Sequence, residues 1–157
     1  MLTPISPYKV IVHKERIEQA IKGEMPPPVT VGLDISNFCN NACPWCLYEE
    51  YKKECNKNMS LNLILKCIKE MGESGVLSCC LSGGGEPTMN DHINDAILSC
   101  IDNGMQVSLN TNGCRLDNLS HKAIEALTYI RVSLDAGSKE THKILHVPSE
   151  GSFNQII

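Results

Sequence analysis

Apolar and polar residues alternate along several short stretches of this chain, and between them lie segments in which apolar residues recur every three to four positions. Apolar residues occupy the odd positions from 29 to 35 and polar or small residues the even ones, which predicts a strand with one apolar face. Ser60 can cap a helix over 61–71 whose apolar residues fall on one side. Further strands are expected over 76–81, 106–110 and 130–134, and further helices over 13–22, over 93–101, from about 120 and after Ser138. This order predicts an α/β fold with a parallel sheet.

The polar positions of these strands share one side of the predicted sheet. Helices would cover the apolar side, because parallel sheets are rarely left uncovered, and the polar side would then form a lumen. The polar side chains are those of Asp34, Ser36, Ser108, Asn110, Asn112, Arg131, Ser133 and Asp135. A closed eight-stranded barrel fills its interior with bulky apolar residues, so a polar lining predicts an open, partial (βα) barrel of about four βα units that holds a ligand. A sheet with one solvated face is the alternative.

Length, composition and charge narrow the class of protein. With 157 residues and 42% hydrophobic content, one domain with a sizeable core is expected, divided into a helix and Pro-rich linker over 1–28 and a core over 29–157. No apolar run approaches the roughly 20 residues of a membrane helix, and a net charge of -4 gives no general attraction to nucleic acid. Nine cysteines, an odd number with three of them clustered, favour metal ligation in a cytoplasmic protein over disulfides.

The clustered cysteines are Cys39, Cys43 and Cys46, directly after the first predicted strand. They supply three thiolates. A zinc site held only by cysteine normally needs four ligands, whereas an iron–sulfur cluster held by three leaves one iron able to bind a substrate or cofactor. The spacing therefore favours an open iron–sulfur cluster, while a zinc-binding interaction domain that recruits Cys55 remains an alternative.

A run of glycines from Gly83 to Gly85, followed by Glu86, ends the second predicted strand. Consecutive glycines let the backbone approach a ligand closely, and the carboxylate of Glu86 can accept hydrogen bonds from an ammonium group. The run is not a P-loop, because no Gly-Lys-Ser/Thr follows it. Taken alone, it could equally be a tight turn between strand and helix.

Together, the cysteine triplet and the turn Gly84-Gly85-Glu86-Pro87 resemble the motifs of the radical S-adenosylmethionine (radical SAM) enzyme superfamily, and the resemblance extends from Val29 to about His146. It implies that the three cysteines hold a 4Fe-4S cluster whose fourth iron is chelated by S-adenosylmethionine. It also implies contacts to that cofactor. The ring of Trp45 would lie along the adenine, the glycine turn with Glu86 would hold the ammonium, and Asn110 and Ser133 would contact the ribose or the carboxylate. The implied residues are Trp45, Gly84, Gly85, Glu86, Asn110 and Ser133.

The implied reaction is reductive cleavage of S-adenosylmethionine to methionine and a 5'-deoxyadenosyl radical, which abstracts hydrogen from a substrate. Such an enzyme needs an external low-potential donor of the flavodoxin or ferredoxin type. The substrate is unknown, and the strand at 130–134 is reminiscent of members that act on peptides or small sugars. A non-catalytic iron–sulfur or electron-transfer module is the runner-up.

The chain departs from the family pattern at several points. Gly83 stands where many members have Thr or Gln, and Lys143 lies near the place of a usual arginine. The usual core is a six-stranded partial barrel, so we expect the core to be truncated after the fourth βα unit. His142 and His146 share a helical face but lack a zinc motif, which predicts surface residues. Three further cysteines are expected to be small core residues: Cys67, Cys79 and Cys100.

Overall fold

The computed structural model describes residues 12–48, 50, 56–148 and 153–157. Four parallel strands form one sheet in the order β1-β2-β3-β4. The strands are β1 (Thr30–Asp34), β2 (Ser78–Ser82), β3 (Gln106–Thr111) and β4 (Tyr129–Val132). Their register places Leu33 beside Leu81, Leu81 beside Leu109 and Leu109 beside Ile130, so that one apolar row crosses the whole sheet. The predicted parallel α/β fold is confirmed.

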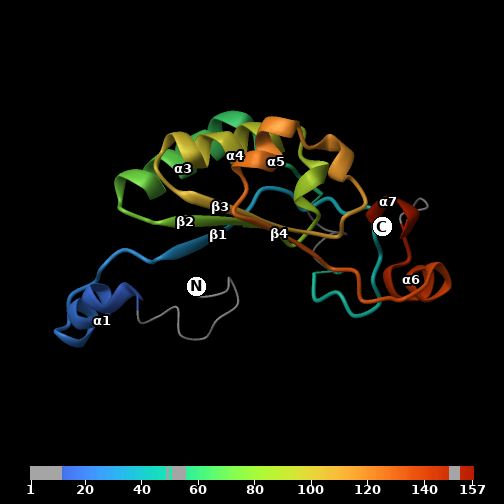
Figure 1. The fold of residues 1–157 in the computed structure, drawn as a ribbon, viewed down its shortest axis with the longest axis horizontal. Helices are drawn as coiled ribbons and strands as arrows, with labels where there is room; N and C mark the ends of the chain where they lie inside the picture. Colours follow the sequence, from blue (N-terminus) through green and yellow to red (C-terminus); the bar gives the residue numbers. More distant parts are fainter. Residues whose placement is uncertain (1–11, 49, 51–55, 149–152) are drawn as a thin grey trace.

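Three helices cover one face of this sheet, as Figure 1 shows: α3 (Leu61–Glu73), α4 (Ile93–Asp102) and α5 (His121–Ala126). The apolar row packs against their inner sides to form the core. The completely buried apolar side chains are those of Ile35, Ile64, Ile68, Cys79, Leu81, Ala96, Ile97, Cys100, Leu109 and Ala123. Cys79 and Cys100 are thus core residues as predicted, whereas Cys67 is only partly buried.

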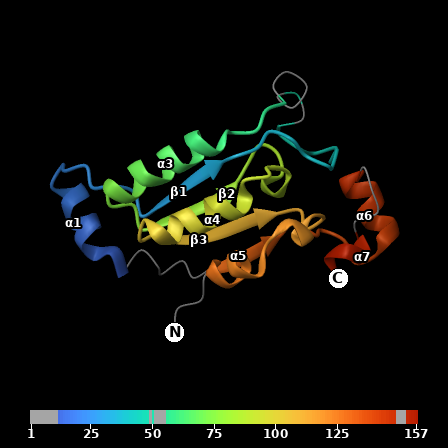
Figure 2. The same ribbon diagram turned by 90° about the horizontal axis from the view of Figure 1, so that it is seen from above.

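The opposite face of the sheet carries the polar residues, as the alternation predicts. On β1 the even-numbered residues Thr30 and Asp34 are exposed while Val31 and Leu33 are half-buried against the core. Figure 2 places α1 (Lys14–Ile21) where the strands begin, and α6 (Lys139–His146) with α7 (Phe153–Ile156) where they end. No helix of the described residues has the length and apolarity needed to cross a membrane.

Serine side chains cap two of the helices. The side chains of Ser120 and Ser138 accept hydrogen bonds of 3.2 Å from the backbone N–H groups of Ala123 and Thr141. Ser60 occupies the N-cap position of α3, but its side chain makes no capping bond. In the described part of the chain, the short helices η2 (Pro87–Met89), η3 (Leu116–Asn118) and α7 were not predicted, because three or four residues are too few to show a helical period.

Candidate functional site

A cavity of about 410 Å³ lies at the carboxyl edge of the sheet, where the loops after all four strands meet. Its lining includes every site residue expected from the sequence: Cys39, Cys43, Cys46, Trp45, Gly84, Gly85, Glu86, Asn110 and Ser133. These residues come from parts of the chain almost a hundred positions apart. The fold therefore brings the cysteine triplet and the glycine turn into one site.

The cysteine loop is held at its start and in its middle by backbone hydrogen bonds. At its start, the N–H of Asn37 donates to the carbonyl of Lys57 at 3.0 Å. In its middle, the N–H of Ala42 donates to the carbonyl of His146 at 3.1 Å, so the end of α6 supports the loop. Cys39, Cys43 and Cys46 are all partly buried. Among the residues that the structure describes, no three His, Cys, Asp or Glu side chains gather around a single metal-ion position.

The glycine turn packs directly on the cysteine loop. The N–H of Gly85 donates to the carbonyl of Ser36 at 3.1 Å, and the N–H of Glu86 donates to the carbonyl of Phe38 at 2.6 Å. A Cβ atom at Gly85 would overlap the carbonyl oxygen of Phe38 and lie 2.5 Å from the carbonyl carbon of Asn37. Only glycine fits this position, because backbone atoms on the facing loop cannot move aside.

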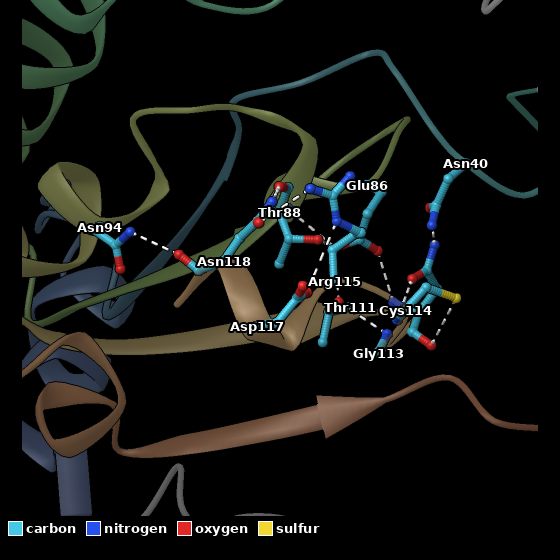
Figure 3. A network of polar contacts seen from close by, with 11 residues as sticks. Asn40, Glu86, Thr88, Asn94, Thr111, Gly113, Cys114, Arg115, Asp117 and Asn118 are labelled. Atoms are coloured by element: carbon cyan, nitrogen blue, oxygen red, sulfur yellow. Dashed lines mark hydrogen bonds and ion pairs between the residues drawn. The ribbon is translucent and has the colours of Figure 1, made fainter. Parts of the chain in front are cut away.

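Glu86 is only 2% exposed, and its carboxylate accepts four hydrogen bonds (Figure 3). Oε1 accepts from the backbone N–H of Thr88 at 3.1 Å, from its hydroxyl at 2.7 Å and from the Thr111 hydroxyl at 2.6 Å. Oε2 accepts from the backbone N–H of Asn112 at 2.7 Å. A carboxylate offers about four acceptor positions, so these donors use most of them. Glu86 thus ties the glycine turn to the end of β3.

Asn112 extends this tie to the cysteine loop. Its side-chain amide donates to Oδ1 of Asn40 at 2.7 Å and lies 3.9 Å from Sγ of Cys39. Its own Oδ1 accepts from the backbone N–H of Cys114 at 2.9 Å. A chain of hydrogen bonds therefore connects Glu86, through Asn112, with the residue beside Cys39.

The two histidines of α6 are buried, contrary to the prediction that they lie on the surface: His142 is 1% exposed and His146 is 2% exposed. Their face of α6 packs on the cysteine loop, and their rings stack with centroids 4.5 Å apart. His146 Nδ1 lies 3.4 Å from Sγ of Cys43, and Nε2 donates to the carbonyl of Leu134 at 2.9 Å. Burial, and secondarily the neighbouring His146, lowers the pKa of His142 below its ordinary value.

Comparison with known proteins shows the family of this chain. Residues 33–157 match the family model of the Radical SAM superfamily. The chain belongs to this superfamily. Its members use a 4Fe-4S cluster and S-adenosylmethionine, and these are the cofactors of this chain. The order of the two motifs in the chain and their meeting in one cavity agree with that assignment.

Two relatives of this radical SAM chain are GTP 3',8-cyclases. A probable GTP 3',8-cyclase of Methanococcus maripaludis is 34% identical over 117 residues, which are 73% of this chain and 39% of the relative. The GTP 3',8-cyclase of Vibrio parahaemolyticus is 30% identical over 131 residues, which are 80% of this chain and 38% of the relative. The radical SAM chain thus spans about two fifths of the length of these relatives.

A solved structure shows the same fold. The crystal structure of Streptococcus suis SuiB bound to the precursor peptide SuiA matches with a TM-score of 0.64 and 19% identity. The match covers 93% of the radical SAM chain and 34% of the SuiB chain. At this identity the likeness concerns the fold alone, a sheet of parallel strands with helices on one face.

The remaining lining residues of the radical SAM cavity are two that the resemblance implied, Trp45 and Asn110, and several that it did not. Trp45 is 49% exposed and meets the His146 ring edge-on at 5.7 Å, and Asn110 donates to Sγ of Cys80 at 3.4 Å. Asn112 and Asp135, which the sequence placed on the lumen side of the sheet, also line the cavity, and the sequence did not indicate four further lining residues: Asn41, Tyr48, Thr111 and His146. The run from Asn110 to Gly113 carried a signal for Thr111 and Asn112, because its polar residues directly follow a strand. Cys55, the predicted alternative ligand, lies outside the described residues.

A larger cavity, of about 960 Å³, lies at the other end of the radical SAM sheet, beside α1. Among the described residues no cysteine lines it, and the arginine that does, Arg16, is already engaged. Arg16 donates to the carbonyls of Pro27 at 2.6 Å, Pro28 at 2.9 Å and Gly75 at 2.7 Å. This cation anchors α1 to the core, and the candidate site is the smaller cavity, which the motif residues line.

Proposed function

We propose that this chain holds the cofactors of a radical SAM enzyme, with Cys39, Cys43 and Cys46 as the three protein ligands of a 4Fe-4S cluster. The observation that carries the proposal is the single cavity lined by all three thiols and by the glycine turn. Three thiolates on one loop leave one iron of a cubane without a protein ligand, which is the position a chelating cofactor needs. Residues 1–28 are proposed as a flanking helix and linker, and residues 29–157 as the core.

The residues around the thiols fit an iron–sulfur cluster. Cluster sulfurs accept hydrogen bonds, and the cavity wall beside the cysteines offers amide donors. One of them, Nδ2 of Asn41, is buried and has no hydrogen-bond partner among the described residues. The backbone N–H of Asn41 also donates to Sγ of Cys39 at 3.5 Å. Such donors favour the thiolate form of cysteine that iron requires.

S-adenosylmethionine would lie across the turn after β2. Trp45 is proposed to pack along the adenine, while Asn110 and Ser133 contact the ribose or the carboxylate. The ammonium is proposed to bind at Gly84, Gly85 and Glu86. Since four internal donors already occupy the Glu86 carboxylate, its contribution is chiefly its negative charge and its hold on the glycine turn.

When bound, these cofactors supply reductive cleavage of the sulfonium to methionine and a 5'-deoxyadenosyl radical that abstracts hydrogen from the substrate. The protein's part is to bind and orient the cofactors and to exclude water from them. A low-potential flavodoxin or ferredoxin is the proposed electron donor, in a cytoplasmic setting. The substrate is proposed to be a small molecule, such as the nucleotide for which the GTP 3',8-cyclases are named, or a peptide such as the one bound by SuiB.

Anaerobic reconstitution with iron and sulfide tests the proposal. The alanine variants of Cys39, Cys43 and Cys46 should each lose the cluster absorbance, while the matched controls Cys67→Ala and Cys80→Ala should keep it. Wild-type protein reduced with dithionite should then cleave S-adenosylmethionine. Loss of the cluster in Cys55→Ala would instead favour a four-thiolate site, and a reconstituted cluster without cofactor cleavage would favour the electron-transfer module.

A further inference from the structure

Asn41 occupies an unusual place in the cavity wall between two of the cysteines. Its side chain is 5% exposed, and its backbone is fixed on both sides, by the N–H bond to Sγ of Cys39 at 3.5 Å and by an antiparallel bridge to Pro148. Its Oδ1 lies 3.8 Å from Sγ of Cys114, the donor of that contact. The other polar atom of the amide, Nδ2, is buried and makes no hydrogen bond with the described residues.

A buried amide N–H without an acceptor is costly, and native proteins seldom keep one. The nitrogen can only donate, so the group that completes this site must be an acceptor. The position belongs to the same cavity as Cys39 and Cys43, the loop residues on either side. Sulfide and thiolate sulfurs are the acceptors that an iron–sulfur cluster would bring to this wall.

We propose that Nδ2 of Asn41 donates a hydrogen bond to a sulfur of the bound cluster and thereby raises its reduction potential. The inference rests on the proposed function, since it needs the cluster. A reduced cluster carries one more negative charge than an oxidised one, so an N–H donor stabilises the reduced state more. Asn41 is then a residue that sets how easily the cluster accepts an electron.

The test compares wild type with Asn41→Leu, Asn41→Ala and Asn41→Gln after anaerobic reconstitution, using redox titration of the cluster followed by electron paramagnetic resonance. Removing the donor should lower the reduction potential of the cluster by about 59 mV. For a one-electron couple, this lowers the ratio of reduced to oxidised cluster about tenfold at a fixed applied potential. The Gln variant keeps the amide and should recover part of the shift. Asn103→Leu, at the C-cap of α4 and outside the cavity, is the matched control and should leave the potential unchanged.

Thermal unfolding of the apo-proteins gives a second measurement that does not depend on the cluster. Because Nδ2 of Asn41 has no acceptor among the residues that the structure describes, Asn41→Leu should melt at or above the wild-type temperature. Equal cluster reduction potentials in wild type and the three Asn41 variants would overturn the inference. A lower melting temperature of the apo-protein in Asn41→Leu and Asn41→Ala, together with an unchanged reduction potential, would also overturn it. Loss of iron in Leu and Ala but not in Gln would support the donor, whereas equal loss in all three would assign Asn41 to loop packing. A wild type that binds no iron would refute the proposed function itself.

Discussion

The buried carboxylate of Glu86 makes the sharpest prediction about stability. In Glu86→Gln one carboxylate oxygen becomes an NH₂ group, which cannot accept a hydrogen bond. If the amide nitrogen takes the place of Oε2, it faces the N–H of Asn112, now 2.7 Å from Oε2, and that buried donor loses its partner. If it takes the place of Oε1, it faces the backbone N–H of Thr88, which loses its partner, while the hydroxyls of Thr88 and Thr111 can turn to accept from it.

The size of the effect follows from these contacts. Leaving one buried donor unpaired costs about 1–3 kcal/mol, and the three remaining bonds weaken because their acceptor is no longer charged. Glu86→Gln should therefore lower the free energy of unfolding by about 2–4 kcal/mol, out of the roughly 5–15 kcal/mol typical of a domain. Glu86→Ala leaves the backbone donors of Thr88 and Asn112 unpaired together and should cost at least as much.

Urea unfolding of the apo-protein, followed by circular dichroism, measures this change without any cofactor. The matched control is Glu73→Gln at the end of α3, whose side chain is 64% exposed and pairs with Lys69 at 3.7 Å. That exposed pair should contribute less than about 0.5 kcal/mol. If Glu86→Gln unfolded within about 0.5 kcal/mol of wild type, the network would not hold the turn as described.

Three further predictions follow from single contacts. Gly85→Ala should lower the free energy of unfolding of the apo-protein by about 3 kcal/mol and prevent cluster assembly, because the added Cβ meets the cysteine-loop backbone. Urea unfolding and reconstitution measure these two effects. Gly32→Ala, whose added Cβ would have nothing within 4 Å, should show neither. His142 has a lowered pKa in the folded protein, so the unfolded chain binds more protons and stability should fall as the pH drops below about 6.5. Urea unfolding at several pH values should show a smaller fall in His142→Phe, and an equal fall would exclude His142 as its source. Arg16→Ala should expose the linker at residues 26–28 to proteolysis, since three carbonyls lose their donor, whereas Lys14→Ala should not.

The sequence predicts those parts of the molecule that depend on local patterns. The alternation at positions 29–35 correctly separates the core side of β1 from its polar side, and the motifs at Cys39 and Gly85 line one cavity at the carboxyl edge of the sheet. Each of these signals is contained in fewer than ten consecutive residues, and the strand order then follows from the rule that parallel strands join through helices.

The rest of the site depends on contacts between distant residues. The bond from Asn112 to Asn40 joins positions 72 apart, and the contact of His146 with Cys43 joins positions 103 apart. No local pattern encodes such pairs. The two histidines of α6 are predicted on the surface because they lack a zinc motif, whereas the packing of α6 on the cysteine loop buries them.

Electron paramagnetic resonance of the reduced, reconstituted protein tests the central claim most directly, because it reports whether an iron of the cluster is open to the cofactor. We expect a 4Fe-4S signal that requires Cys39, Cys43 and Cys46 and that changes when S-adenosylmethionine is added. A protein that binds zinc in place of iron, or a four-iron signal that S-adenosylmethionine leaves unchanged, would contradict it.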